Sequence, residues 1–181
     1  MERLLLWRGL DSWRAESAHV RLDERGLEAH GIQLGAAPEP YRLDYRLRTD
    51  PKLVTTSLEL SLLRSGRLRR LVLERSVDGR WKADNRAVHE VDGALDCDLA
   101  LSPLTNYMPV RRLAGVPADH LMAWVSVPEL ELSRSEQRYE PLGPLRVRFV
   151  ELDDGFVAEL ELDDDGFVTH YPDLAERVPA E

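Results

Sequence analysis

Apolar and charged side chains alternate with a period of two along much of this 181-residue chain. In residues 41–48, Tyr and Leu occupy the odd positions, whereas Arg and Asp occupy the even ones. Successive side chains of a β-strand point to opposite faces, so such a segment forms a strand with one buried and one solvated face. Similar alternation returns at 58–62, 71–75 and 145–149. The pattern restricts the chain to an architecture of amphipathic strands.

Short polar turns separate these strands. Asp-Pro-Lys at 50–52 and Ser-Gly at 65–66 end the first two runs, and Asp-Gly pairs stand at 78–79, 154–155 and 165–166. Asp-Gly is typical of short hairpin loops, because both residues tolerate a positive φ. Strands joined in this way predict an antiparallel meander.

Helical periodicity is scarce, and proline recurs in the central region, where it kinks or breaks long helices. These prolines are Pro103, Pro109, Pro117, Pro128, Pro141 and Pro144. We expect one or two short helices, at 117–122 and 174–178. The predicted fold class is all-β (mainly β), with a curved antiparallel sheet that forms an open or half β-barrel, since curling limits exposed sheet edges.

We expect a single domain over 1–181, in which the two halves have similar patterns. Residues 41–45 (YRLDY) align with 145–149 (LRVRF), and an acidic turn and a second strand follow each. This similarity fits a degenerate duplication, roughly 1–90 and 91–181. It is explained equally well by the constraint that alternation places on any amphipathic hairpin.

Charge and cysteine content limit the partners and the compartment. With 24 basic and 33 acidic residues the formal net charge is -9, which repels a phosphate backbone, so no nucleic-acid partner is expected. The single cysteine, Cys97, cannot form an intramolecular disulfide and fits a reducing compartment. Leu4–Leu6 is too short for a signal peptide, and no segment is apolar enough to span a membrane. We predict a cytoplasmic protein without an integral membrane segment.

Motifs for cofactors and metals are missing. The chain has no Gly-Lys-Ser/Thr phosphate loop and no glycine-rich dinucleotide fingerprint. After His89-Glu90, the position of a second zinc-binding His holds Gly93, and the five histidines are scattered. Asp163–Gly166 resembles the start of a calcium loop, but a hairpin turn explains it better. We therefore expect no metal and no cofactor.

Polar residues of unusual kinds gather between Trp81 and Tyr139. Asp96 and Asp98 would point to the same face of a strand, either as a carboxylate pair or as ion-pair partners of Arg111 or Arg112. The segment 102–106 (SPLTN) either holds an irregular loop through side-chain to backbone bonds or lines the mouth of a cavity.

If this segment lines a cavity, Asn106, Arg112 and Tyr139 would contact a sugar or phosphate head while apolar side chains hold an acyl tail. Ordinary core packing is the simpler explanation of Trp81 and Trp124. The candidate ligand-binding residues are Trp81, Asp84, Asp98, Thr105, Asn106, Arg111, Arg112, Gln137, Arg138 and Tyr139.

At these residues the chain resembles a bacterial family named putative glycolipid-binding proteins, formerly a domain of unknown function. The matching segments are Gly-x-Trp-x-Ala-Asp at 79–84, Asp-Cys-Asp-Leu at 96–99, Ser-Pro-x-Thr-Asn-x-x-Pro-x-Arg-Arg-Leu at 102–113, Gln-Arg-Tyr at 137–139 and Tyr-Pro at 171–172. The resemblance covers nearly the whole chain. Asn85 stands where the family usually has Gly, and Tyr107-Met108 replaces a smaller Thr-Leu pair.

The resemblance implies a fold similar to the half-open β-barrels of bacterial lipoprotein carriers, and it brings no established catalytic residues. Our leading hypothesis is a non-enzymatic protein that binds a lipid or glycolipid in its concave face or cavity. The alternative is a small enzyme acting on a polar or glycosylated molecule through Asp96 or Asp98, with Arg112 as electrostatic stabiliser. A scaffold or interaction module would instead show a flat apolar patch or a free strand edge.

Overall fold

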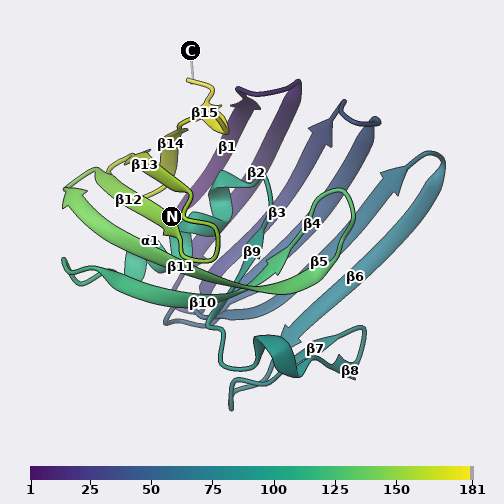
Figure 1. The fold of residues 1–181 in the computed structure, drawn as a ribbon, viewed down its shortest axis with the longest axis horizontal. Helices are drawn as coiled ribbons and strands as arrows, with labels where there is room; N and C mark the ends of the chain where they lie inside the picture. Colours follow the sequence, from purple (N-terminus) through teal and green to yellow (C-terminus); the bar gives the residue numbers. More distant parts are fainter. Residues whose placement is uncertain (180–181) are drawn as a thin grey trace.

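The computed structural model describes residues 1–179, and its strands form one 15-stranded sheet (Figure 1). The strands are β1 (Glu2–Gly9), β2 (Arg14–Asp23), β3 (Gly26–Gly35), β4 (Tyr41–Thr49), β5 (Thr55–Arg64), β6 (Arg67–Arg75), β7 (Trp81–Ala83), β8 (Arg86–Ala87), β9 (Asp96–Leu99), β10 (Ala118–Val125), β11 (Leu132–Gly143), β12 (Arg146–Glu151), β13 (Val157–Leu162), β14 (Val168–Tyr171) and β15 (Ala175–Arg177). The helical turns are η1 (His89–Val91), η2 (Pro103–Asn106) and α1 (Tyr107–Arg112).

The sheet is a meander in two arms that meet at β1 and β15. Its order is β8-β7-β6-β5-β4-β3-β2-β1-β15-β14-β13-β12-β11-β10-β9, and neighbouring strands are antiparallel except for the parallel pair β9–β10. Trp7 of β1 stands opposite Arg177 of β15, so the first and last strands lie side by side in the middle of the sheet. The edges are β8 and β9, and the strongly curved sheet does not close. These observations confirm the predicted open half-barrel.

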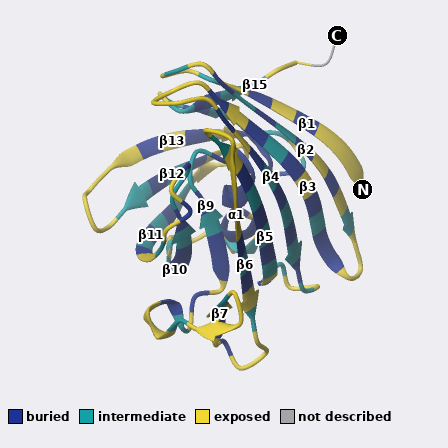
Figure 2. Cartoon of the chain, turned by 90° about the vertical axis from the view of Figure 1, so that its right-hand side faces the viewer, coloured by how far each residue is buried: buried dark blue, intermediate teal, exposed yellow. Residues whose placement is uncertain are grey.

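The alternation seen in the sequence becomes the two faces of this sheet (Figure 2). In β4 the side chains of Tyr41, Leu43, Tyr45 and Leu47 are buried on the concave face, whereas the residues between them are exposed or half-buried. Leucines of β5 stand opposite the last three of these residues, and two of those leucines stand opposite Leu71 and Leu73 of β6. In this arm, the alternation in the sequence therefore corresponds to the alternation of buried and more exposed side chains.

The helix positions expected from the sequence were wrong. Residues 118–125 and 175–177 are the strands β10 and β15, and the only α-helix among the described residues is the six-residue α1. Pro109 lies in the first turn of α1, where its missing N–H would have had no partner within the helix. Across the described residues, no helix has both the length and the apolar character needed to cross a membrane.

The chain fills its own concave face. The segment 96–112, which contains β9, η2 and α1, lies between the two arms of the sheet (Figure 1). Leu99, Leu104, Tyr107 and Met108 of this segment are buried in one core cluster with leucines of β4, β5 and β6. The concave face, where the leading hypothesis placed the lipid, is thus occupied by protein side chains.

A buried carboxyl group fixes this central segment to the sheet. Glu16 of β2 accepts hydrogen bonds from the hydroxyls of Tyr45 (2.6 Å) and Ser102 (2.7 Å). Gln33 of β3 donates from its amide to the carbonyl of Ala100 at 3.3 Å. Burial raises the pKa of Glu16 to about 7, although its hydrogen bonds oppose that rise.

Glycine in β3 makes room for the tyrosine that reaches Glu16. Gly31 stands opposite Tyr45 in register, and a Cβ at Gly31 would lie 2.1 Å from Cζ of the Tyr45 ring. The ring therefore lies flat across the strand. Gly35 and Tyr41 repeat the arrangement four residues further along β3.

We predict that Gly31→Ala lowers the free energy of unfolding by about 1–3 kcal/mol, because the new methyl group forces the Tyr45 ring off its site. Urea denaturation measures the change. Gly143→Ala is the control, since a Cβ at Gly143 meets no atom within 4 Å. Equal denaturation midpoints for the two variants would contradict the packing described here.

Glu16 also predicts a pH dependence. Because its pKa is about 7 in the folded state against 4.5 unfolded, the folded protein binds the extra proton, and stability falls as the pH rises from about 4.5 to beyond 7. This single group accounts for a loss of about 3 kcal/mol. In Glu16→Gln, denaturant titrations across this window should show a smaller loss. Parallel curves for both proteins would rule out a buried, protonatable Glu16.

Candidate functional site

A pocket opens where the end of β9 meets the strands of the second arm. Its volume is about 180 Å³. The residues that line it are Asp98, Leu99, Ala100, Leu101, Ser102, Asn106, Trp124, Gln137, Phe149, Glu151, Phe156, Tyr171 and Leu174. They come from the central segment on one side, and on the other from β10, β11, β12, β14 and the loops that follow β12 and β14. The pocket therefore lies at the boundary between the filling segment and the sheet.

Asp98 is the polar centre of this pocket. Its carboxylate accepts one hydrogen bond from the Thr105 hydroxyl and one from the Gln137 side-chain amide, each at 2.7 Å. Burial raises the pKa of Asp98, and the two hydrogen bonds oppose the rise. Asp98 has no arginine partner within the described residues, in contrast to Asp96. A carboxyl group that stays available to a ligand thus faces the pocket.

Further hydrogen bonds hold the side-chain amides of Asn106 and Gln137 beside Asp98. The Tyr139 hydroxyl lies 3.0 Å from Oδ1 of Asn106 and 3.1 Å from Oε1 of Gln137. Asn106 donates its amide to the Pro103 carbonyl at 3.3 Å. These three polar side chains are buried, and their mutual bonds fix the amides in one orientation. The pocket is consequently preorganised.

Glu151 and Tyr171 bring two further polar groups to the opposite wall. Burial raises the pKa of Glu151, and the nearby carboxylates of Asp154 and Asp98 raise it further. Burial likewise raises the pKa of the Tyr171 phenol, with smaller contributions from Asp98 and Glu151. The pocket therefore offers carboxyl groups and a neutral hydroxyl to a polar ligand.

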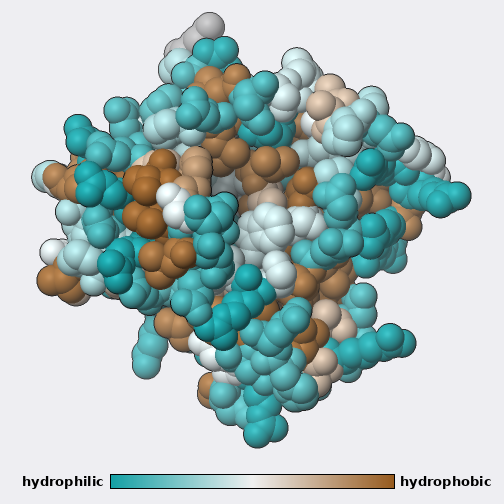
Figure 3. Space-filling view, viewed as in Figure 1, coloured by the Kyte–Doolittle hydropathy of each residue, from teal (hydrophilic) through white to brown (hydrophobic). Residues whose placement is uncertain are grey.

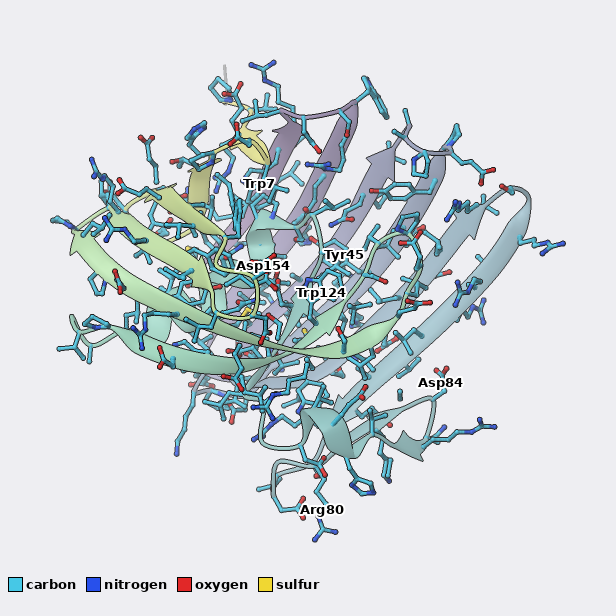
Figure 4. All side chains as sticks on the ribbon, in the orientation of Figure 1. Trp7, Tyr45, Arg80, Asp84, Trp124 and Asp154 are labelled. Carbon is cyan, nitrogen blue, oxygen red and sulfur yellow. The ribbon has the colours of Figure 1, made fainter. Side chains whose placement is uncertain are left out.

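Aromatic rings complete the wall. Phe149 contacts Tyr171 and Tyr139, with ring centroids 6.1 Å and 5.4 Å apart. Trp124 is half-buried, and it lies on the same side of the molecule as the β12–β13 loop that carries Asp154 (Figure 4). Phe156 of that loop is 42% exposed. Apolar faces and fixed hydrogen-bonding groups thus share one small pocket.

An apolar rim continues outward from the pocket. Leu152, Phe156 and Val157 are all exposed in and beside the β12–β13 loop. Figure 3 shows apolar atoms gathered over β12 and β13 on this face. The rim is continuous with the pocket because Phe156 belongs to both.

The structure brings five of the predicted site residues together. Asp98, Asn106 and Gln137 line the pocket, and Thr105 and Tyr139 hold them in place.

Trp81 and Asp84 lie elsewhere. Trp81 is buried in the core, where its indole N–H donates to the Ala94 carbonyl at 3.0 Å. Asp84 accepts a hydrogen bond from the backbone N–H of Val72, in the small β7–β8 lobe far from Trp124 (Figure 4). Both residues stabilise the edge of the first arm.

The three arginines among the predicted residues also lie outside the pocket. Arg112 binds both carboxylate oxygens of buried Asp96 and donates to the Leu53 carbonyl at 2.6 Å. Burial raises the pKa of Asp96 to about 6, against the opposing effect of Arg112. Arg138 pairs with Asp119 on the surface, and Arg111 lines a different cavity near Gly166. The sequence left two roles open for Asp96, a carboxylate pair with Asp98 or an ion pair with an arginine. The structure shows the ion pair, with Arg112.

Sequence reasoning missed Glu151, Phe156 and Tyr171 as pocket residues. One signal was present, because Glu151 shares its parity with Phe149 and Val147 on β12. A carboxylate at a position where alternation demands an apolar residue marks a polar site within the core.

Comparison with protein families gives a match over residues 4–177 to a family described as "Putative glycolipid-binding". The chain belongs to this family. Among solved structures, the crystal structure of a DUF1089 family protein from Pseudomonas aeruginosa at 1.80 Å resolution is similar, with a TM-score of 0.79 and 31% identity over 93% of each chain. No curated protein matches the chain. The resemblance expected from the sequence is confirmed.

Within this member of the putative glycolipid-binding family, the motifs have two different roles. Residues of the segments 96–99, 102–113, 137–139 and 171–172 line the pocket, whereas 79–84 belongs to the distant β7–β8 lobe. Four of the five motif segments therefore contribute residues to the pocket.

We predict that Arg112→Met lowers the free energy of unfolding by about 3–5 kcal/mol, because Asp96 is left buried without its partner. Urea denaturation at neutral pH checks this value. Arg138→Met breaks an exposed pair and should cost less than about 1 kcal/mol. The double variant Asp96→Asn/Arg112→Met should regain part of the loss. Equal costs for the two arginine variants would remove the structural role assigned to Arg112.

Proposed function

We propose that this protein binds a glycolipid without catalysis, with the sugar head in the Asp98 pocket and the acyl chain across the apolar rim. The observation that carries the proposal is the combination of aromatic walls with fixed carboxyl and amide groups in one pocket. Hydroxyl groups of a sugar are met by acceptors and donors, and its C–H faces pack on aromatic rings.

The size of the pocket limits which part of the ligand can enter it. At about 180 Å³ it is smaller than the roughly 300–1,000 Å³ of pockets that enclose a drug-sized ligand. An acyl chain cannot enter the concave face either, because the central segment fills it. The head is therefore enclosed and the tail stays at the surface, which revises the position that the sequence suggested for the tail.

The preorganised polar groups favour a neutral polyhydroxyl head. Asn106, Gln137 and Tyr139 are fixed before a ligand arrives, so binding does not require them to be ordered. Asp98 and Glu151 have raised pKa values and accept hydrogen bonds from hydroxyl groups. An acidic head would be repelled by these carboxyl groups when they ionise.

The enzyme hypothesis loses Asp96 and Arg112, two of the three residues on which it was built. Arg112 and Asp96 saturate each other outside the pocket, which leaves Asp98 without the electrostatic stabiliser assigned to it. The cytoplasmic location stays a prediction from the sequence.

Octyl glucoside below its micelle concentration is a direct probe, and calorimetry measures its binding. We expect binding to be about tenfold weaker for methyl glucoside, which lacks the chain, and for octanoate, which lacks the sugar. Trp124→Ala and Asp98→Asn should each weaken binding of octyl glucoside about tenfold or more, which corresponds to about 1.4 kcal/mol.

Trp13→Ala is the matched control, since Trp13 is 66% exposed and lies outside the pocket. Its affinity should equal that of the unmodified protein. If Trp13→Ala and Trp124→Ala weaken binding equally, or if octanoate binds as well as octyl glucoside, the proposal is wrong.

A further inference from the structure

The β5–β6 hairpin concentrates positive charge in an acidic protein. Four of the seven residues in 64–70 are arginine and none is acidic, although the net charge of the chain is -9. The four are Arg64, Arg67, Arg69 and Arg70. The hairpin turn lies at one end of the long axis of the molecule, at the right of Figure 1. The charge is thus segregated at one tip.

Three of these arginines have no carboxylate partner. Arg64 pairs with Glu39 at 3.0 Å and with Glu129 at 3.4 Å. Within residues 1–179, no carboxylate oxygen lies within 4.0 Å of the guanidinium groups of Arg67, Arg69 or Arg70. Most arginines of β2 and β4 on the convex face are paired, as Arg46 is with Glu28. The hairpin is therefore left with positive charge that the protein does not neutralise.

Two of the free arginines border a notch. Arg67 and Arg69 lie on the same face of β6, because residues two apart on a strand share a face. With Arg64, Ser65 and Pro128 of the β10–β11 loop they line a cavity of about 220 Å³. Guanidinium groups that meet in a notch suit a phosphate oxyanion, which accepts their N–H groups in pairs.

The other face of the same hairpin carries exposed leucines. Leu63 and Leu68 stand opposite each other in register and are 47% and 57% exposed. Arg70 follows Leu68 on this face. The hairpin tip thus combines exposed leucines with unpaired arginines, as do segments that lie in the interface of a lipid bilayer, where apolar groups insert and cations meet lipid phosphates.

We propose that the β5–β6 hairpin docks on the surface of a bilayer that contains anionic phospholipid. Arg67, Arg69 and Arg70 bind the lipid phosphates, and Leu63 and Leu68 insert between the head groups. The acidic bulk of the protein does not prevent this, because charges more than about 8–10 Å from the surface are screened at physiological salt. The docking rests on the hairpin alone and is independent of the Asp98 pocket.

A nucleic acid fits this surface less well. A phosphate backbone would use the arginines but would leave the Leu63–Leu68 pair exposed to water. The patch is also confined to one hairpin, whereas a nucleic acid backbone requires positive charge along a groove or a stripe.

Co-sedimentation with vesicles tests the proposal. Vesicles of phosphatidylcholine with phosphatidylglycerol should bind the protein, vesicles of phosphatidylcholine alone should bind it far more weakly, and added salt should release it. Arg67→Gln/Arg69→Gln should lower the partition coefficient about 25-fold, since each basic residue contributes roughly fivefold. Leu63→Ser/Leu68→Ser should lower it about tenfold.

Arg80→Gln/Arg86→Gln is the matched control, because it removes the same charge from the exposed β7–β8 lobe. It should bind vesicles as the unmodified protein does, and a circular dichroism melt should show that all variants fold. Equal binding to both kinds of vesicle, no binding to either, or an equal loss in the control would overturn the proposal. So would binding of a single-stranded oligonucleotide that depends on Arg67 and Arg69 while the vesicles stay unbound.

Discussion

The contact between the central segment and the concave face of the sheet is the constraint on which the rest of the structure depends. Two contacts hold it: Glu16 of β2 accepts a hydrogen bond from Ser102, and Arg112, which pairs with buried Asp96 inside the segment, donates to the Leu53 carbonyl between β4 and β5. Burying a carboxyl group costs free energy unless it is hydrogen-bonded or paired, so these contacts favour one position of the segment over others. With the segment in place, a sheet that would otherwise enclose an apolar hollow has a packed core and a small polar pocket beside it.

The fold class could be predicted from the sequence because alternation is a local property. Residues 41–47 show the same parity in the sequence and in the burial of β4, and the acidic turns stand where the hairpins turn. The helix positions failed because 118–125 and 174–178 lack a strong pattern of either period, and sheet pairing decided their structure. The proposed duplication stays a prediction.

The site could be predicted only in part. Asp98, Thr105, Asn106, Gln137 and Tyr139 attracted attention because polar residues stood in strands or next to prolines, and the structure brings them together. Arg112 and Asp96 are polar residues that attracted attention for the same reason, but in the structure they pair with each other and stabilise the fold. No local pattern separates these two roles, because burial and partner identity are set by segments far apart in the chain. Glu151 of β12, for example, lines the same pocket as Asp98 of β9, although the two residues are far apart in the sequence.

The indole N–H signals of Trp7, Trp81 and Trp124 in a proton–nitrogen NMR spectrum test most directly where an amphiphile binds. Trp7 and Trp81 are 1% exposed in the filled core, whereas Trp124 lines the pocket. Titration with a short-chain glycolipid should shift the Trp124 signal and leave those of Trp7 and Trp81 in place. Shifts of Trp7 and Trp81 without a shift of Trp124 would show that the ligand opens the core, and would contradict this account.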